Sequence, residues 1–329
     1  HAGLRLWHAC AVAPLVESLR PARPPRRSLL ALALAASLAG CGARRTSALS
    51  PDPTTPFPDS SPPAASPTPS ETNATVSAPP ESVSPSPTPS AASAPTRDEI
   101  AARYSGASPA WFDLEGEGIV SRTPSSGVCL TLDACGGAHG SGVDEDLVSL
   151  LLDRGIPFTA FLNSRWVEAN PATLDRLLAS GIVEIGNHGT AHLPLSVTGQ
   201  SAYGIAGTTD AGQVYDEIMG CQELLTSRTG TAPRFFRPGT AHWDDVSVAI
   251  AHDLGVEAAG FSINADAGAT FSAAQVSSEL RRAGAGDVVI SHMNQPAGST
   301  AEGYAQAIPA LMEGGTVFLT LGQAIPAPA

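Results

Sequence analysis

The chain has 329 residues, and its formal net charge is −13. Residues 98–329 contain 10 Arg, no Lys and 26 Asp and Glu. A nucleic acid or another polyanion would require a basic surface on its partner, so this composition excludes nucleic-acid binding as an expected function.

The first 41 residues are typical of an export signal. Arg26 and Arg27 precede a short apolar run at residues 29–36, which is too short to span a bilayer. The small residues that lead to Cys41 resemble a bacterial lipobox, in which this Cys becomes the lipidated first residue of the mature protein. We therefore expect export and a lipid anchor on the extracytoplasmic face of the cell membrane, with the lipid as the only membrane contact. Secretion without an anchor is the alternative.

Residues 42–97 are rich in Pro, Ser, Thr and Ala and contain almost no large apolar side chain. Such a segment cannot bury enough surface to offset the entropy of ordering, so it predicts a disordered, extended tether. Residues 98–329 are long enough for one large catalytic domain, which we expect to be monomeric.

Within this domain, short apolar runs typical of strands alternate with amphipathic stretches typical of helices. In chain order, strands are predicted at 128–132, 158–162, 183–185, 234–236, 258–263, 288–290 and 317–319, and helices at 143–153, 172–179, 215–226, 245–252, 273–283 and 301–313. This alternation indicates parallel strands with right-handed crossovers. Seven strands favour an α/β fold of the incomplete (β/α)7-type barrel, while an open doubly wound sheet is the alternative.

Polar side chains follow the predicted strands at one end. They are Asp133, His188, His192, Arg237, Asp266 and His292. The carboxyl ends of barrel strands share one face, where active sites are built, so we expect these six residues to form one functional cluster. Two His residues four positions apart can also converge on one metal ion such as zinc.

Four segments that carry these residues resemble motifs of the NodB-homology polysaccharide deacetylases, carbohydrate esterase family four. Residues 130–137, Leu-Thr-Leu-Asp-Ala-Cys-Gly-Gly, resemble the family's Thr-Phe-Asp-Asp-Gly motif. Residues 188–192 resemble its His-x-x-x-His motif, residues 237–239 its Arg-Pro-Pro-Tyr-Gly motif in shortened form, and residues 288–292 its final apolar run that ends in His. The resemblance spans about 200 residues and implies a (β/α)7-type barrel that removes acetyl groups from N-acetylated sugars with the help of a divalent metal.

The residue types also fit amide hydrolysis. Asp133 could accept the proton of the attacking water, and His292 could protonate the departing amine. Arg237 could keep Asp133 ionised, and Asp266 could orient His292 in the same way. The metal, held by His188 and His192, would be zinc or cobalt.

One departure from the family motif concerns the metal. Ala134 stands where the family has a second Asp that serves as a metal ligand, and Ala cannot coordinate. Asp133 or Asp266 could act as the third ligand, or the metal could be weakly bound or absent. For the neighbouring Cys135 we expect a disulfide or a buried thiol rather than a ligand role, and Cys129 and Cys221 leave the pairing of the three thiols open.

Other residues near these motifs are candidates for contact with substrate. Backbone N–H groups of Gly239 and Thr240 could stabilise an oxyanion. Trp243 could stack on a sugar ring or simply pack in the core. Asn294 could donate a hydrogen bond to substrate, and His242 is a further candidate for the cleft.

We therefore expect a metal-assisted N-deacetylase that acts on an acetylated cell-envelope glycan, peptidoglycan-like or chitin-like. Two alternatives are open. One is a C–N hydrolase acting on a small amide, possible without a metal. The other is a glycan-binding domain that does not catalyse a reaction.

Overall fold

The computed structural model describes residues 94–326, all of which belong to one compact unit. The expected signal region 1–41 and nearly all of the expected tether 42–97 lie outside these residues. The described residues start just before helix α1 (Arg97–Arg103), which Thr96 caps through a reciprocal pair of contacts with Glu99. Arg97 forms an ion pair of 2.8 Å with Asp216, so folded structure begins slightly before the expected boundary at residue 98.

The remaining helices are α2 (Glu145–Asp153), α3 (Ser164–Ala169), α4 (Pro171–Ala179), α5 (Ala211–Thr229), α6 (Asp245–Asp253), α7 (Ala273–Leu280), α8 (Thr300–Glu313) and α9 (Leu321–Ala324), with a 3₁₀ turn η1 (Gly239–Ala241). The strands are β1 (Phe112–Asp113), β2 (Ile119–Val120), β3 (Val128–Ala134), β4 (Phe158–Leu162), β5 (Val183–Asn187), β6 (Ser201–Ala202), β7 (Ile205–Ala206), β8 (Phe235–Phe236), β9 (Trp243–Asp244), β10 (Glu257–Ala259), β11 (Ile263–Asn264), β12 (Val288–His292) and β13 (Phe318–Leu319).

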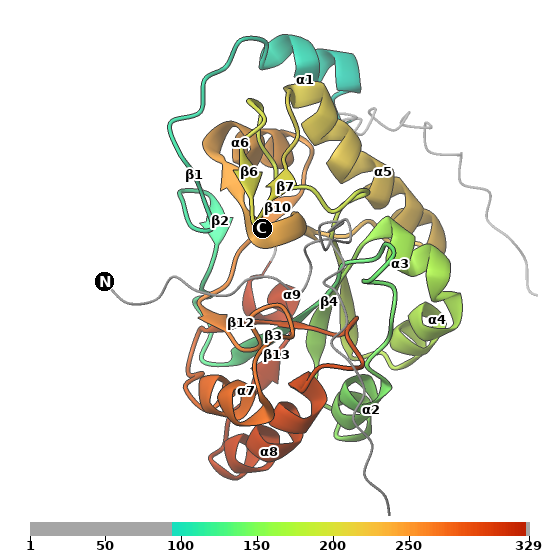
Figure 1. The fold of residues 1–329 in the computed structure, drawn as a ribbon, viewed down its shortest axis with the longest axis vertical. Coiled ribbons are helices and arrows are strands. Elements are labelled where there is room, and N and C mark those ends of the chain that lie inside the picture. The colour runs from blue at the N-terminus through green and yellow to red at the C-terminus, as the bar shows by residue number, and fades with distance from the viewer. Residues whose placement is uncertain (1–93, 327–329) are drawn as a thin grey trace, which may run out of the picture. The chain divides into compact units, whose positions relative to one another are not determined.

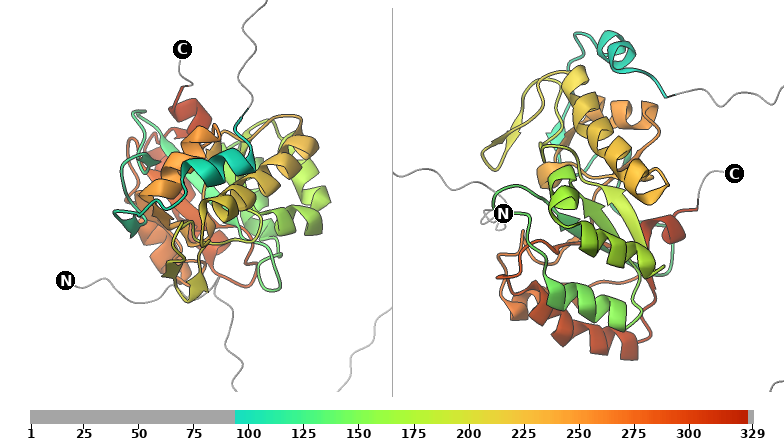
Figure 2. Two further views of the ribbon diagram at one scale, coloured as in Figure 1. Left: turned by 90° about the horizontal axis from the view of Figure 1, so that it is seen from above. Right: turned by 90° about the vertical axis from the view of Figure 1, so that its right-hand side faces the viewer.

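The main sheet is parallel and runs in the order β11-β12-β3-β4-β5-β8-β10-β2, with β13 also paired to β3. The strands curl into a barrel that does not close between β11 and β2. Helices follow one another around its outside, with α7, α8 and α2 at the bottom of Figure 1, α3 and α4 at its right, and α5 and α6 at its top (Figures 1 and 2). The predicted incomplete (β/α) barrel is therefore confirmed.

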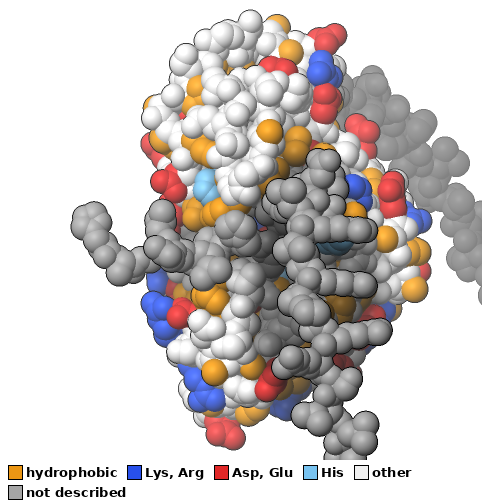
Figure 3. All heavy atoms as spheres, viewed as in Figure 1, with side chains coloured by type: hydrophobic (Ala, Val, Ile, Leu, Met, Phe, Trp, Pro, Cys, Tyr) orange, Lys and Arg blue, Asp and Glu red, His pale blue; other side chains and the backbone are white. Residues whose placement is uncertain are grey.

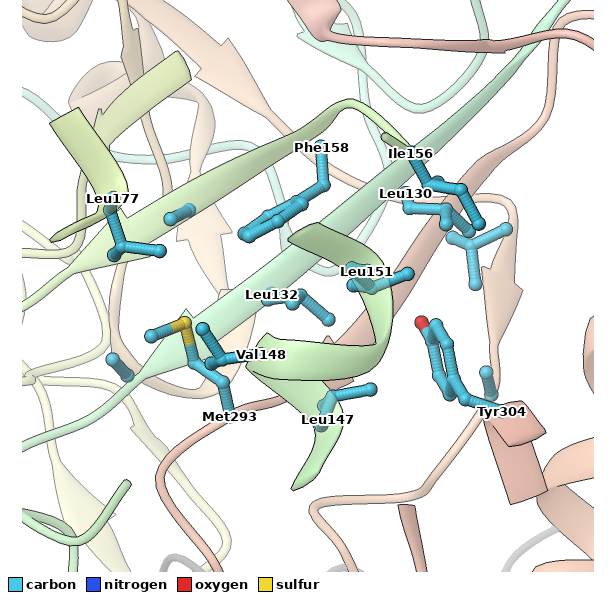
Figure 4. Close-up of a cluster of buried hydrophobic side chains, with 14 of the residues drawn as sticks. Leu130, Leu132, Leu147, Val148, Leu151, Ile156, Phe158, Leu177, Met293 and Tyr304 are labelled. Atoms are coloured by element: carbon cyan, nitrogen blue, oxygen red, sulfur yellow. The ribbon is translucent and has the colours of Figure 1, made fainter. Parts of the chain in front are cut away.

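The largest apolar cluster lies between the sheet and its outer helices (Figure 4). Leu130 and Leu132 of β3 contribute to it, together with Leu147 and Leu151 of α2 and Tyr304 of α8. Every residue of β3 is buried, because the parallel strand is covered on both faces. This packing fixes the position of β3, the strand that leads directly into the candidate site.

One predicted strand is wrong in extent. Residues 258–263 do not form one strand, because the chain changes neighbours at Gly260: β10 lies between β8 and β2, whereas β11 pairs with β12. The Gly260 N–H still bonds to Val120, and the Ser262 N–H already bonds to Val288. Residues 260–262 thus pass across the open side of the barrel and bring the segment after β11 next to the end of β12.

None of the helices among residues 94–326 is long and apolar enough to cross a membrane. Where the described residues are visible in Figure 3, Arg side chains are scattered among acidic ones and form no continuous basic patch.

Candidate functional site

The six polar residues predicted to cluster all lie at the carboxyl ends of the sheet strands and are all at least nine-tenths buried. Asp133 is near the end of β3 and His292 ends β12, where the two residues are direct partners in the strand register. The other four follow β5, β8 and β11, and they are His188, His192, Arg237 and Asp266. The structure thus brings residues more than 150 positions apart to one end of the barrel.

Asp133 is held by a buried ion pair. The Arg237 Nη1 donates to Asp133 Oδ1 over 2.7 Å and to Thr131 Oγ1 over 2.8 Å, and its Nη2 donates to the Gly260 carbonyl. The guanidinium also lies over the Phe161 ring, 4.2 Å from the centroid. Burial alone would raise the pKa of Asp133, but Arg237 and the nearby imidazoles outweigh it and hold that pKa below its ordinary value. Asp133 is therefore ionised at neutral pH and can accept a proton.

His292 is oriented by Asp266. Its Nδ1 lies 2.9 Å from Asp266 Oδ1, and since an ionised carboxylate can only accept, Nδ1 carries the proton. The His292 backbone N–H and the Thr300 hydroxyl both donate to the other oxygen of Asp266. This carboxylate is fully buried. Several donors fix its position, and it in turn fixes the tautomer and the direction of the His292 ring.

One ring nitrogen of His188 forms a hydrogen bond, and the other has no hydrogen-bond partner. Its Nδ1 is 2.7 Å from the Arg237 carbonyl oxygen, which can only accept, so the proton is on Nδ1. The unprotonated Nε2 is buried, has no hydrogen-bond partner and lies 3.7 Å from Asp133 Oδ2. Burial lowers the pKa of His188, which keeps this lone pair available. A buried basic nitrogen whose opposite side donates to a carbonyl is the arrangement of a metal-ligating His.

Two side chains hold the loop of residues 188–193, here called the His192 loop, in place. Glu217 of α5 accepts the backbone N–H groups of Ala191 and Leu193 over 2.8 and 3.1 Å, and burial raises the pKa of Glu217 to about 7. The Asn163 amide donates to the carbonyls of His188 and Gly189. His192 itself has a φ of 63°, a left-handed conformation that these contacts maintain.

His192 packs against His188 with ring centroids 4.9 Å apart. Burial, reinforced by the neighbouring His188, lowers the pKa of His192 well below its ordinary value. Both imidazoles are therefore neutral at physiological pH, which is the form that binds metals.

A buried thiol lies close to both histidines. Cys135 offers a ligand atom that lies, with those of His188 and His192, within 4.8 Å of one another, and all three residues are buried. Of the two predicted alternatives for a third ligand, Asp266 is held by His292, whereas Asp133 binds Arg237 through Oδ1 and keeps its Oδ2 3.7 Å from His188 Nε2. The orphaned His188 Nε2 and the N/S donor set together fit a zinc-type ion. The sequence predicted a disulfide or a buried thiol for Cys135, and the buried thiol is confirmed. Its position two residues after Asp133 was the signal that could have pointed to the site.

The three thiols of the described region are buried, and none of them forms a disulfide. Burial raises the pKa of Cys129 to about 11 and that of Cys221 to about 12. These two therefore remain protonated core thiols, as the sequence suggested for Cys129.

Trp243 and Asn294, two of the residues predicted to contact substrate, are buried and do not line an exposed cleft edge. Trp243 is fully buried against Phe236, with ring centroids 5.5 Å apart, which favours its packing alternative over stacking on a sugar. The Asn294 amide donates to the Gly140 carbonyl and so holds the loop after β3.

Gly239 lies beside His192, and Thr240 follows it in the turn η1. A Cβ on Gly239 would come within 2.1 Å of the His192 carbonyl, so only glycine permits this approach. Thr240 has a φ of 67°, and its buried hydroxyl has no hydrogen-bond partner. His242 lies instead in a partly buried aromatic group with Phe112 and Tyr203.

Comparison with known proteins supports this assignment of the domain. Residues 121–259 match the family model described as polysaccharide deacetylase, a stretch that contains Asp133, His188, His192 and Arg237. No curated protein matches the chain.

Solved structures show the same fold at low identity. A family 4 carbohydrate esterase pseudoenzyme from Bacillus anthracis is 20% identical, with a TM-score of 0.52, over 62% of this chain and 67% of its own. The Bc1960 peptidoglycan N-acetylglucosamine deacetylase is 22% identical, with a TM-score of 0.54, over 64% and 94%. PdaA of Bacillus subtilis, a family 4 carbohydrate esterase, is 19% identical, with a TM-score of 0.51, over 63% and 83%. The family resemblance is thus confirmed: residues 121–259 match the polysaccharide deacetylase model, and Ala134 stands where the first motif has its second Asp.

Proposed function

We propose that the chain is a metal-assisted hydrolase that removes acetyl groups from an N-acetylated cell-envelope polysaccharide, peptidoglycan-like or chitin-like. The observation that carries the proposal is the pairing across β3 and β12. Asp133, kept ionised by Arg237, is the register partner of His292, which is oriented by Asp266. A proton acceptor and a proton donor therefore flank one position beside the buried histidine pair.

Hydrolysis of an acetamide needs both groups. Water adds its oxygen to the acetyl carbon while Asp133 takes one of its protons. The C–N bond then breaks, and the leaving nitrogen receives a proton by way of His292, so that acetate and a free amine are the products. Asp266 does not touch the reacting atoms; it is a positioning residue that holds the His292 ring by its Nδ1.

His188 and His192 would hold the divalent ion, zinc or cobalt. Such an ion would polarise the acetyl carbonyl and make water more acidic, which is the contribution that neither Asp133 nor His292 can supply. Gly239 lies against the His192 backbone, and the backbone N–H groups of Gly239 and Thr240 are candidates for stabilising the developing oxyanion.

The glycan assignment draws on similarity. The Bc1960 relative is named as a peptidoglycan N-acetylglucosamine deacetylase. The expected export signal and Cys41 anchor would place the domain where such glycans occur. Fractionation of cells that make the full chain, with Cys41→Ala as the comparison, tests the anchor: the native chain should partition with membranes and the variant should not.

The test of activity is acetate release. The full chain, loaded with zinc or cobalt, should release acetate from N-acetylated chito-oligosaccharides or peptidoglycan, and a chelator should stop the release. O-acetylated xylan, assayed in parallel, distinguishes ester from amide cleavage. Absence of acetate from every N-acetylated glycan in the metal-loaded protein would overturn the proposal.

A second candidate, a glycan-binding domain without catalysis, is favoured by one observation: Ala134 removes a carboxylate from the family's first motif. The Bacillus anthracis relative of similar fold is named as a pseudoenzyme. Glycan binding that Asp133→Asn leaves unchanged, with no acetate released by the parent chain, would establish this candidate instead.

A further inference from the structure

We propose that the Cys135 thiolate is the third protein ligand of the metal and takes the place of the carboxylate missing at Ala134. The inference deepens the proposed function and rests on it in one respect, namely that the site holds a divalent ion.

The alternation of side chains along β3 places Cys135 on the site face. Thr131 and Asp133 both contact Arg237 inside the barrel, whereas Leu130, Leu132 and Ala134 pack in the outer apolar cluster. Since successive strand residues point to opposite faces, the residue after Ala134 returns to the side of Asp133. This agrees with the position of Cys135, whose sulfur lies beside the ring nitrogens of His188 and His192.

The turn after Cys135 keeps it there. Gly136 and Gly137 have φ values of 70° and 82°, and a Cβ on Gly136 would come within 2.8 Å of the Trp166 backbone nitrogen. One Arg165 nitrogen donates to the carbonyl of Cys135 over 3.4 Å and to that of Ala191 over 3.0 Å. The same guanidinium therefore links the two loops that carry the thiol and the histidines.

Two independent observations point to an ion between them. The ligand atoms of Cys135, His188 and His192 lie within 4.8 Å of one another. The His188 Nε2 is buried, unprotonated and without a partner, which is costly unless something occupies its lone pair. One thiolate and two neutral imidazoles also carry the same single negative charge as one carboxylate and two imidazoles, so the site keeps its charge with a softer donor. Softer donors select zinc over manganese or magnesium.

The other thiols of the described region are not alternatives. Cys129 lies on the same face of β3 but at the opposite end of the strand, in a separate apolar cluster. Cys221 lies on α5, and its Sγ donates to the Leu162 carbonyl. Cys129 is therefore a matched control: it has the same residue type and the same strand face, but it lies away from the site.

The test is cobalt spectroscopy on the full chain, without an affinity tag, reduced and stripped of metal. One Co²⁺ per chain should bind and produce a thiolate-to-cobalt charge-transfer band in the near ultraviolet. Cys135→Ser should abolish the band and weaken zinc binding at least about 10-fold, because it removes a ligand. Cys129→Ser should leave both unchanged. Cys135→Asp should bind one cobalt without the band, which separates loss of the ligand from loss of the fold.

Absence of the band in the parent chain, or its persistence in Cys135→Ser, would overturn the ligand assignment. The outcome is independent of turnover. A band without acetate release supports the thiolate ligand and overturns the proposed deacetylase, whereas acetate release by a cobalt-loaded chain without the band does the reverse.

Discussion

Asp133 and His292 have partners that fix their charge and direction, whereas His188 Nε2, a few ångströms away, has none among the described residues. We call these regions the proton-transfer half, made of Asp133, Arg237, Asp266 and His292, and the metal half, made of Cys135, His188 and His192. In the first, both carboxylates are bound by a protein cation or imidazole. In the second, the buried His188 Nε2 has no hydrogen-bond partner, and a bound ion would supply one. The difference indicates that the acid–base residues are preorganised and that a metal ion would complete the site.

The largest effect is expected from a substitution that removes the cation of the proton-transfer half. Arg237→Met keeps the side-chain length and its contact with the Phe161 ring but leaves Asp133 as a buried carboxylate without a cation. The free energy of unfolding, measured in urea, should fall by about 3–5 kcal/mol. Arg176→Met removes an exposed pair with Glu145 and should cost under about 1 kcal/mol. Equal losses in the two variants would show that the buried pair has no special role.

The next effect tests whether the halves are separable. His292→Gln removes the proton donor but no metal ligand, so kcat should fall at least about 100-fold while zinc affinity stays the same. Turnover and zinc titration are measured on the same preparation. His252→Gln, at an exposed position of α6, serves as the control. A parallel fall in zinc affinity would mean that the two halves act as one unit.

A smaller effect concerns the support of the metal half. Glu217 accepts the N–H groups of Ala191 and Leu193 with separate oxygens, and in Glu217→Gln one of these faces an amide NH₂ instead. We expect a loss of about 1–3 kcal/mol in stability and zinc binding weakened about 10-fold. Glu223→Gln, exposed on the same helix, should change neither. Unchanged zinc affinity in Glu217→Gln would show that the His192 loop does not depend on this carboxylate.

The smallest effect on stability is expected at Asp253, which lies outside both halves and serves as a reference for them. Burial opposes ionisation of Asp253, but hydrogen bonds from Tyr104 and Arg103, together with the charge of Arg103, outweigh it and hold the pKa of Asp253 below its ordinary value. A carboxyl with a lowered folded-state pKa stabilises the fold above its unfolded pKa, and this contribution is lost as the pH falls through the folded-state pKa. Asp253→Asn should therefore cost under about 1 kcal/mol at pH 7 and nothing in strong acid, as judged by urea unfolding at several pH values. A loss that is the same at all pH values would contradict the assignment.

Much of the fold could be predicted, because strand and helix periodicities are local properties. The strand at 158–162 matches β4, and the helix predicted at 245–252 matches α6 to within one residue. The break at Gly260 could not be predicted, since it depends on which strands flank β10 and β11. The two-residue strands β1 and β9, which pair with each other across more than 100 positions, carry no periodic signal.

The site was predicted where residues follow strands, as with Asp133 and His292. The proximity of Cys135 to His188 and His192 was not predicted, because motif comparison directed attention to Ala134. Glu217 was missed because it lies in the middle of a helix, where its contact with the His192 loop is purely tertiary.

The most direct measurement counts acetate and new free amines released together from an N-acetylated chito-oligosaccharide by the zinc-loaded full chain and by Asp133→Asn. We predict one amine for each acetate in the parent chain and a rate at least about 100-fold lower in the variant, because the ionised carboxylate that accepts the water proton is gone. Failure of the parent chain to release acetate, or equal rates in both proteins, would contradict the hydrolytic site described above.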